Sequence, residues 1–285
     1  GYFDVAYAMA LQSDGKIVLA GYSYNGFDNN IALVRYNSNG SLDNSFDTDG
    51  IVTSDFGGSD DLAKSMLIQT DGKILVAGFC DLGLNIDFAL ARYNSNGTLD
   101  NTFDLDGKVC TDFGSIVDVG YAVTLQSDGK IIVAGTSIDS TSNYNFALAR
   151  YNTNGSLDNT FDSDGKLITL FGVDEDYGCA IAIQADSKIV VAGMSNNGSY
   201  YDFAVARYHY TITITGTEPE SNEPSLSAYP NPSSGIFTLS VKNLNTDAKI
   251  CIYDVLGNCL WNNNNKKVAV NEIDLSNHSK GIYFI

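Results

Sequence analysis

The sequence is poor in histidine, in cationic residues and in long apolar runs. Its 285 residues include two His, four Pro and one Trp, and 16 Lys and Arg stand against 34 Asp and Glu, for a net charge of −18. The two histidines, His209 and His278, are too few for a clustered base or metal site. An acidic surface repels nucleic acid and anionic membranes, and no apolar run approaches the roughly 20 residues that a spanning helix needs. We therefore expect no nucleic-acid partner and no membrane-spanning segment.

Cysteine is also scarce, and its five positions do not follow any regular spacing. No Cys-x-x-Cys pair suggests zinc or redox chemistry, and the odd count argues against a disulfide framework. Most of the thiols are expected to be small buried hydrophobic groups. A bridge across one predicted hairpin, between Cys251 and Cys259, is the alternative. The cysteines are Cys80, Cys110, Cys179, Cys251 and Cys259.

What the chain does have is one segment written four times. LQSDGKIVLAG returns with few changes, and the arginines that follow each copy lie 57, 58 and 57 residues apart. A period this constant predicts a repeat architecture. The copies are Leu11–Gly21, Ile68–Gly78, Leu125–Gly135 and Ile183–Gly193, and the arginines are Arg35, Arg92, Arg150 and Arg207.

Each repeat has turn signals that divide it into four short strands. Ser13-Asp14-Gly15 separates two apolar runs, as in a hairpin, and Ile31–Tyr36 supplies a third strand. A polar turn over Asn37–Gly50 precedes a fourth strand at Ile51–Gly57. No helical periodicity is present, so the fold class is all-β: a β-propeller-like array of four-stranded blades. The Ala-Gly pair that ends each copied segment suits inner strands where blades crowd together.

The repeats predict a division of the chain into an array, a linker and a second domain. The fourth repeat lacks the polar turn, and His209–Thr215 reads as a substitute last strand. Two alternatives are left open. The four repeats could close into a four-bladed ring, or further blades could lie upstream of Gly1, which is not preceded by an initiator Met or signal peptide. Residues 217–226 are rich in Pro and acids and predict an exposed linker. The predicted limits are 1–57, 58–114, 115–172 and 173–216 for the repeats, 217–226 for the linker and 227–285 for the second domain.

The repeats resemble the delta-60 repeat family. The resemblance rests on a Q-x-D-G-K-hydrophobic run and an R-Y-N-x-x-G-S-L-D-x-x-F segment, and it covers about residues 1 to 210. It implies a secreted, propeller-like repeat protein and assigns no reaction.

The second domain resembles the C-terminal sorting domain of the type IX secretion system. Tyr229–Gly235 reads Y-P-N-P-x-x-G, Ile252–Gly257 reads I-Y-D-x-x-G, and Asp274–Tyr283 begins D-L-S and ends G-x-Y. The resemblance implies a small immunoglobulin-like β-sandwich that outer-membrane secretion machinery recognises. It also implies a signal peptide upstream, and further strands with a basic terminus beyond Ile285, so that the domain is truncated here. The expected location is secreted or on the cell surface of a bacterium.

Recurring acids are the strongest candidates for chemistry. Three aspartates precede a glycine in each polar turn, a spacing that could hold Ca²⁺ weakly, but turn capping explains the same residues without a metal and is preferred. No cofactor is therefore expected. A second recurring set of aspartates, at the start of the first strand, is predicted to pair with the repeat arginines. The turn acids are Asp43, Asp47, Asp49, Asp100, Asp104, Asp106, Asp158, Asp162 and Asp164; the strand acids are Asp4, Asp61, Asp118 and Asp176.

These observations leave two functions. The favoured one is a non-catalytic, secreted or cell-surface scaffold that binds an extracellular glycan or protein through aromatics near the loop after the second strand. The alternative is a secreted hydrolase, with acids at the propeller mouth or a catalytic domain further upstream. The acids obey the repeat, whereas an active site breaks it, so catalysis is the weaker hypothesis and no catalytic residue is assigned. The candidate ligand-binding residues are Tyr22, Tyr24, Phe27, Phe79, Tyr144, Tyr200 and Tyr201.

Overall fold

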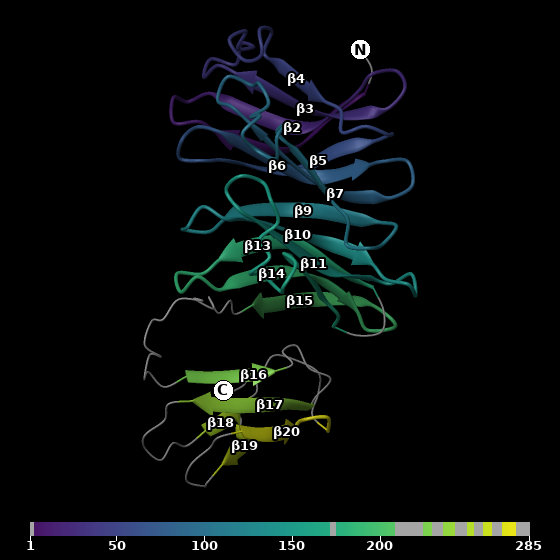
Figure 1. Cartoon of the computed structure of the whole chain (residues 1–285), viewed down its shortest axis with the longest axis vertical. Coiled ribbons are helices and arrows are strands. Elements are labelled where there is room, and N and C mark those ends of the chain that lie inside the picture. Colours follow the sequence, from purple (N-terminus) through teal and green to yellow (C-terminus); the bar gives the residue numbers. More distant parts are fainter. Residues whose placement is uncertain are drawn as a thin grey trace. The chain divides into compact units, whose positions relative to one another are not determined.

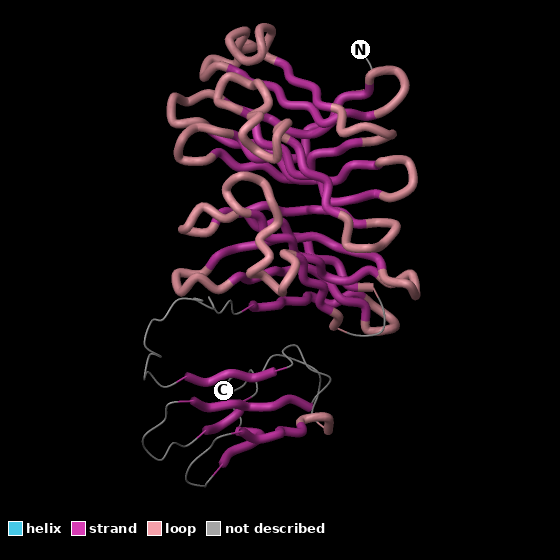
Figure 2. The backbone as a smooth tube through the Cα atoms, in the orientation of Figure 1, coloured by secondary structure: helices cyan, strands magenta, loops and turns pink. Residues whose placement is uncertain are grey.

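In the computed structural model, the regular secondary structure of the described residues consists of antiparallel sheets (Figures 1 and 2). The structure describes residues 3–171, 175–208, 225–229, 236–242, 250–253, 259–263 and 270–277. No helix occurs among these residues, and thus none that could cross a membrane. The all-β fold class predicted from the repeats is confirmed.

Each repeat forms one sheet whose strands pair in sequence order, and we call these sheets blades 1 to 4. The hairpin between the first two strands turns at the Asp-Gly pair in blades 1 to 3, where Gly15 has φ of 81°. Blade 4 has three described strands, and the predicted fourth one at His209–Thr215 lies outside the described residues. Blade 1 contains β1 (Asp4–Leu11), β2 (Ile17–Tyr24), β3 (Asn29–Tyr36) and β4 (Ile51–Ser54); blade 2 contains β5 (Asp61–Ile68), β6 (Ile74–Asp81), β7 (Ile86–Tyr93) and β8 (Lys108–Thr111); blade 3 contains β9 (Asp118–Leu125), β10 (Ile131–Ile138), β11 (Tyr144–Tyr151) and β12 (Lys166–Thr169); blade 4 contains β13 (Asp176–Ile183), β14 (Ile189–Asn196) and β15 (Tyr201–Tyr208).

Successive blades pack face to face (Figure 1). Among the described residues of the blades, three apolar layers lie between neighbouring blades. In the first layer, Val18 and Leu33 of blade 1 meet Ile74 and Tyr93 of blade 2. A tyrosine hydroxyl crosses each layer to a Ser or Thr on the fourth strand of the preceding blade, which satisfies both buried polar groups. These pairs are Tyr93 with Ser54 at 2.9 Å, Tyr151 with Thr111 at 2.7 Å and Tyr208 with Thr169 at 3.0 Å.

The outer faces of the first and last blades expose the residues that are buried at the internal layers. Phe146 of blade 3 is fully buried against blade 4, whereas Phe203, its counterpart in blade 4, is 102% exposed. At the other end, Met9 of blade 1 is 65% exposed, but the equivalent Met66 packs into the first layer. Burial therefore depends on the presence of a neighbouring blade and not on the residue type.

A β-bulge in the first strand explains the repeated Ala-Gly pair. Each pairing of first and second strands shifts register by one residue at equivalent positions. The shift pushes a first-strand carbonyl against the glycine, so that a Cβ on Gly78 would lie 1.8 Å from the Leu62 carbonyl oxygen. The crowding predicted for these small residues therefore lies within each blade, between its first two strands. The extra residue of the bulge is Tyr7, Lys64, Tyr121 or Cys179.

The structure corrects the prediction for the cysteines. Cys80 on β6 and Cys110 on β8 form a disulfide within blade 2, with their Cα atoms 6.6 Å apart. No pattern along the chain indicated this bridge, because the other blades have no cysteine pair at these positions. Cys179 and Cys259 are exposed free thiols, so the alternative bridge from Cys251 to Cys259 is not formed.

The chain divides into two compact units, residues 1–213 and 214–285. The described residues of the second unit form a three-stranded sheet in the order β16-β17-β20 and a two-stranded sheet, β18-β19. Two antiparallel sheets are the components of the predicted sandwich. The strands are β16 (Ser225–Tyr229), β17 (Ile236–Lys242), β18 (Ile250–Tyr253), β19 (Cys259–Asn263) and β20 (Val270–Asp274).

Candidate functional site

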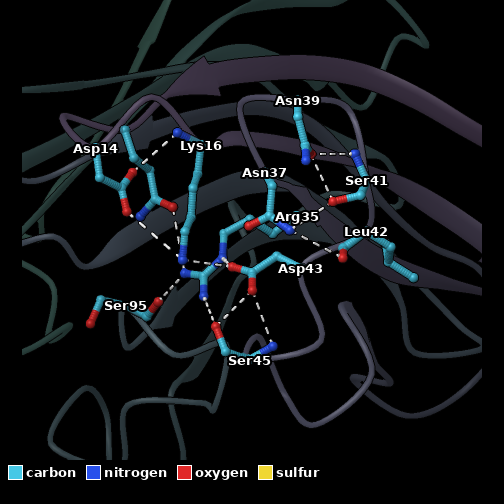
Figure 3. A network of polar contacts seen from close by, with 11 residues as sticks. Asp14, Lys16, Arg35, Asn37, Asn39, Ser41, Leu42, Asp43, Ser45 and Ser95 are labelled. Atoms are coloured by element: carbon cyan, nitrogen blue, oxygen red, sulfur yellow. Dashed lines mark hydrogen bonds and ion pairs between the residues drawn. The ribbon is translucent and has the colours of Figure 1, made fainter.

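The first recurring acid of the polar turn is engaged in a structural network, which Figure 3 shows for Asp43. In blade 1, Arg35 Nε lies 2.6 Å and Lys16 Nζ 2.9 Å from Asp43 Oδ2. Asp43 Oδ1 accepts hydrogen bonds from the backbone N–H and hydroxyl of Ser45. Arg35 Nη1 also donates to the Ser95 carbonyl oxygen of blade 2, and its guanidinium lies 4.5 Å from the centre of the Phe46 ring. The network thus fixes one turn and ties it to the next blade.

The same network recurs in the next two blades. Asp100 lies 2.7 Å from Arg92 and 2.8 Å from Lys73, and Asp158 lies 2.7 Å from Arg150 and 2.6 Å from Lys130. Burial favours the neutral carboxyl, but the hydrogen bonds from Lys130 and Thr160 outweigh it and lower the pKa of Asp158 to about 2. These carboxylates are ionised and fully partnered.

The other turn acids shape the backbone of the turn. Asp49 Oδ1 accepts from the Ile51 N–H, and Asp106 and Asp164 do the same for Lys108 and Lys166. The middle acid of each turn has a positive φ, which aspartate tolerates better than most residues. Turn chemistry therefore explains these acids, as the sequence favoured, and their geometry gives no support to calcium binding in the turn. The middle acids are Asp47, Asp104 and Asp162.

The predicted pairing between the first-strand acids and the repeat arginines is wrong. Arg35, Arg92 and Arg150 bind turn acids. Asp61, Asp118 and Asp176 instead accept the backbone N–H groups of Phe56, Phe113 and Phe171. Each of these phenylalanines follows the fourth strand of the preceding blade, so the bond still connects two blades. Sequence could not reveal this because the acceptor binds a main-chain group, which every residue other than proline offers.

The structure spreads the seven aromatic candidates over all four blades. Tyr22, Tyr24 and Phe79 are half-buried on second strands, and Tyr144 and Tyr201 begin third strands. Phe27 and Tyr200 lie in the hairpin loops and are 93% and 76% exposed. The loop edge after the second strand is therefore aromatic, but its members do not converge on one place.

Two aromatic groups form when residues that the sequence did not single out are included. In the blade 1/2 group, the rings of Tyr7 and Tyr22 are 6.1 Å apart, and Lys64 Nζ lies 3.8 Å from the Tyr7 ring centre and 5.8 Å from that of Phe79. These are cation–π distances. Tyr7 and Lys64 are bulge residues, and they vary between blades while their neighbours repeat.

The second group, which we call the tyrosine group, consists of Tyr144, Tyr177 and Tyr201 at the junction of blades 3 and 4. The rings of Tyr144 and Tyr177 are stacked with centroids 5.0 Å apart, and Tyr177 and Tyr201 are 6.2 Å apart. The Tyr177 hydroxyl lies 3.3 Å from Glu175 Oε2, which also accepts from the Tyr201 hydroxyl. The sequence did not single out Tyr177, because the equivalent residues of the other repeats are Val5, Leu62 and Val119. An aromatic residue in one repeat alone forms no recurring pattern.

A third cluster consists of acids at the junction of blades 2 and 3. Ligand oxygens of Asp87, Asp112 and Asp118 all lie within 4.8 Å of one another. Burial, together with the charges of Asp112 and Asp118, raises the pKa of Asp87 to about 6. A cavity of about 560 Å³ opens at this junction, lined by residues that include Asp112, Ser115 and Ser137.

Comparison with known families identifies both parts of the chain. Residues 12–46, 69–103, 126–161 and 184–209 match the family described as a domain of unknown function (DUF5122) beta-propeller. Residues 227–285 match the secretion system C-terminal sorting domain. Both resemblances noted in the sequence are thereby confirmed, and the sorting domain assigns the chain to type IX secretion, to the cell surface or the extracellular space. No curated protein matches the chain.

Several solved structures are similar to the chain at low identity. The endo-arabinase from Bacteroides thetaiotaomicron VPI-5482 is 11% identical, with a TM-score of 0.40, over 72% of this chain and 74% of that one. A thermostable family-43 glycoside hydrolase is 12% identical, with a TM-score of 0.45, over 82% of both chains. A protein of unknown function from Bacteroides caccae is 12% identical, with a TM-score of 0.41, over 94% of this chain and 86% of that one.

Proposed function

We propose that this chain, which consists of DUF5122 β-propeller repeats and a secretion system C-terminal sorting domain, binds a neutral glycan outside the cell without cleaving it. The observation that carries the proposal is the tyrosine group. Tyr144, Tyr177 and Tyr201 place three rings next to one another, and Tyr201 is 48% exposed. Aromatic faces of this kind pack against the apolar C–H faces of sugar rings, while hydroxyls at their edges bond the sugar hydroxyls.

The polar groups at this junction suit a neutral ligand. Glu175 accepts from two tyrosine hydroxyls, so these phenols are oriented and their remaining acceptor capacity points to other donors. Residues 1–216 contain 11 basic and 27 acidic residues, which disfavours an anionic polysaccharide. An uncharged glycan offers hydroxyl donors to the phenol oxygens and is not repelled by the acidic surface of the repeats.

The function is tested by binding of the full chain to a panel of neutral polysaccharides, measured by affinity electrophoresis and calorimetry. Tyr177→Ala and Tyr201→Ala are each expected to weaken binding about tenfold, which corresponds to roughly 1.4 kcal/mol. Phe27→Ala is the control, because that ring is 93% exposed in a loop outside the tyrosine group. Equal affinity for wild type and both tyrosine variants would contradict the proposal. Release of new reducing ends from a bound polysaccharide would favour the secreted hydrolase instead.

A further inference from the structure

The acid cluster at the junction of blades 2 and 3 brings together carboxylates from three separate segments. Asp87 is on β7, Asp112 directly follows β8, and Asp118 begins β9 in the next blade. Asp87 is 5% exposed and Asp118 is fully buried, whereas Asp112 is exposed. Two buried carboxylates and one at the surface therefore face one another at a blade junction.

The cluster breaks the repeat. At the junction of blades 1 and 2, the equivalent residues are Asn30, Asp55 and Asp61, and at the junction of blades 3 and 4 they are Asn145, Leu170 and Asp176. The other two junctions form with two acids or one. A third carboxylate is therefore not needed to assemble the blades, and its mutual repulsion with the other two opposes folding.

The negative charge of the cluster is not neutralised by an ion pair. Among the described residues, no salt bridge involves Asp87, Asp112 or Asp118. Lys166 is close by, but its ammonium binds the main-chain carbonyl oxygen of Asp112 at 3.0 Å and lies 3.8 Å from Asp164 Oδ2. The structure thus contains an uncompensated group of carboxylates, which is costly when buried.

Two buried oxygens beside the cluster also lack hydrogen-bond partners. Asp87 Oδ1 is one of them, and the other is Oγ of Ser137, a residue that is 1% exposed, pairs with Asp118 across the sheet and lines the same cavity as Asp112. At the first junction, Asn30 and Asp61 also have unpartnered buried oxygens, but Asn30 is a neutral amide, so two acids rather than three meet there. Asp118 is already oriented, because its two oxygens accept from Ser115 Oγ at 2.7 Å and from the Phe113 N–H at 2.8 Å.

We propose that Asp87, Asp112 and Asp118 bind a calcium ion that links blade 2 to blade 3. Hard carboxylate and hydroxyl oxygens are the ligands that Ca²⁺ takes, in an irregular shell that water completes. The exposed Asp112 and the adjoining cavity give the ion a route from solvent. Extracellular modules bind calcium weakly, at about 0.1–1 mM, and this chain belongs to that class by its sorting domain. The site is separate from the buried turn acids Asp43, Asp100 and Asp158, whose carboxylates each bind an Arg and a Lys.

The chain supplies its own matched variants for a test. Asp87→Asn installs the residue that occupies this column in blades 1 and 3, and Asn30→Asp creates a triad of three acids with Asp55 and Asp61 at the first junction. Calcium is added to chelator-treated full chain, and stoichiometry is measured by calorimetry alongside the thermal unfolding temperature. The wild type is expected to bind one ion at this site and to unfold at a higher temperature with calcium. Asp87→Asn and Asp112→Asn are expected to lose this binding and the thermal shift, and Asn30→Asp to gain a second ion.

The proposal also predicts the behaviour of the variants without metal. In chelator, Asp87→Asn is expected to unfold at the same or a higher temperature than wild type, because it removes an uncompensated buried charge. Retention of wild-type calcium binding in both Asp87→Asn and Asp112→Asn would overturn the site. The absence of calcium binding and of a thermal shift in wild type at about 10 mM Ca²⁺, which is 10-fold above the weakest expected affinity of about 1 mM, would also overturn it. An equal thermal shift with Ca²⁺ in wild type and Asp87→Asn would show charge screening only and would likewise overturn it.

Discussion

At the scale of single residues, the chain uses its few cations to hold buried acids. Each of the first three blades has an Arg and a Lys directed at one turn aspartate, and this aspartate is at most 5% exposed. A buried charge is tolerated only when it is paired and hydrogen-bonded, and removing one partner leaves the other uncompensated. The turn acid is therefore a point of high sensitivity although it lies in a polar loop.

Asp100→Asn tests this sensitivity and its dependence on pH. Burial opposes ionisation of Asp100, but the bonds from Lys73, Thr102 and Arg92 hold the pKa of its carboxyl well below the usual range. Because the folded pKa is below the unfolded value of about 4, the stabilisation is present above pH 4 and is lost as the pH falls. At pH 7, Asp100→Asn is expected to lower the free energy of unfolding by about 3 kcal/mol, measured by urea denaturation.

The difference between Asp100→Asn and wild type should shrink as the pH is lowered below about 4, because wild type loses this stabilisation as the pH falls towards the lowered folded pKa of Asp100, whereas Asn does not titrate. Asp106→Asn is the control, because Asp106 lies in the same turn but is exposed and caps a single backbone N–H. Its effect should stay within about 0.5 kcal/mol. A difference for Asp100→Asn that does not change with pH would contradict the assignment.

At the scale of the element, the defining feature of a blade is the bulge in its first strand. The bulge brings a carbonyl oxygen of the first strand close to the glycine of the second strand. It also leaves one first-strand residue without a partner in the register between the two strands. The backbone of the bulge is repeated in every blade, while its side chain is Tyr, Lys, Tyr or Cys. The blade thus combines an invariant frame with one position that is free to vary.

Gly78→Ala tests the close approach within blade 2. A Cβ at this position would lie 1.8 Å from the Leu62 carbonyl oxygen, so one of the two strands has to move. We expect a loss of about 2–3 kcal/mol in the free energy of unfolding, as for other overpacked sites, measured by chemical denaturation. The control Lys64→Ala removes the bulge side chain and leaves its backbone, and should cost less than about 1 kcal/mol. Equal losses in both variants would show that the side chain, rather than the backbone, maintains the bulge.

At the scale of the first compact unit, stability depends on which blade faces are covered. The three internal layers bury equivalent residues, and the two outer faces expose them. The two ends therefore contribute less to the stability of the array than the middle, as is general for repeat proteins whose units contact only their neighbours.

Phe146→Ala and Phe203→Ala compare equivalent residues of two repeats in a buried and an exposed environment. Phe146 is fully buried between blades 3 and 4, so its truncation is expected to cost about 3–5 kcal/mol. Phe203 occupies the equivalent place on the open face of blade 4 and is 102% exposed, so the same truncation should change the free energy of unfolding by no more than about 0.5 kcal/mol. Thermal and urea unfolding of both variants would measure the difference. Similar losses would mean that the outer face of blade 4 is covered.

Features that depend on short-range chemistry could be predicted from the chain alone. The Asp-Gly turns, the alternation of strands and the constant period predicted four blades, because a turn and its two flanking strands are specified within about a dozen residues. The motifs of the tail likewise identified the sorting domain. Capping by Asp49 and Asp106 was predictable for the same reason, since the acceptor and the donor lie two residues apart.

Contacts between side chains of different strands and blades emerged only from the folded arrangement. It paired Arg35 with Asp43 rather than with a first-strand acid, and it connected Cys80 to Cys110. It also buried Phe146 while leaving the equivalent Phe203 exposed. Finally, it brought the carboxylates of Asp87, Asp112 and Asp118 together. Identical repeats give identical local signals, whereas charge pairing and burial depend on the neighbour that a blade packs against. The positions at which the repeat is broken therefore acquire their meaning only when the blades are stacked.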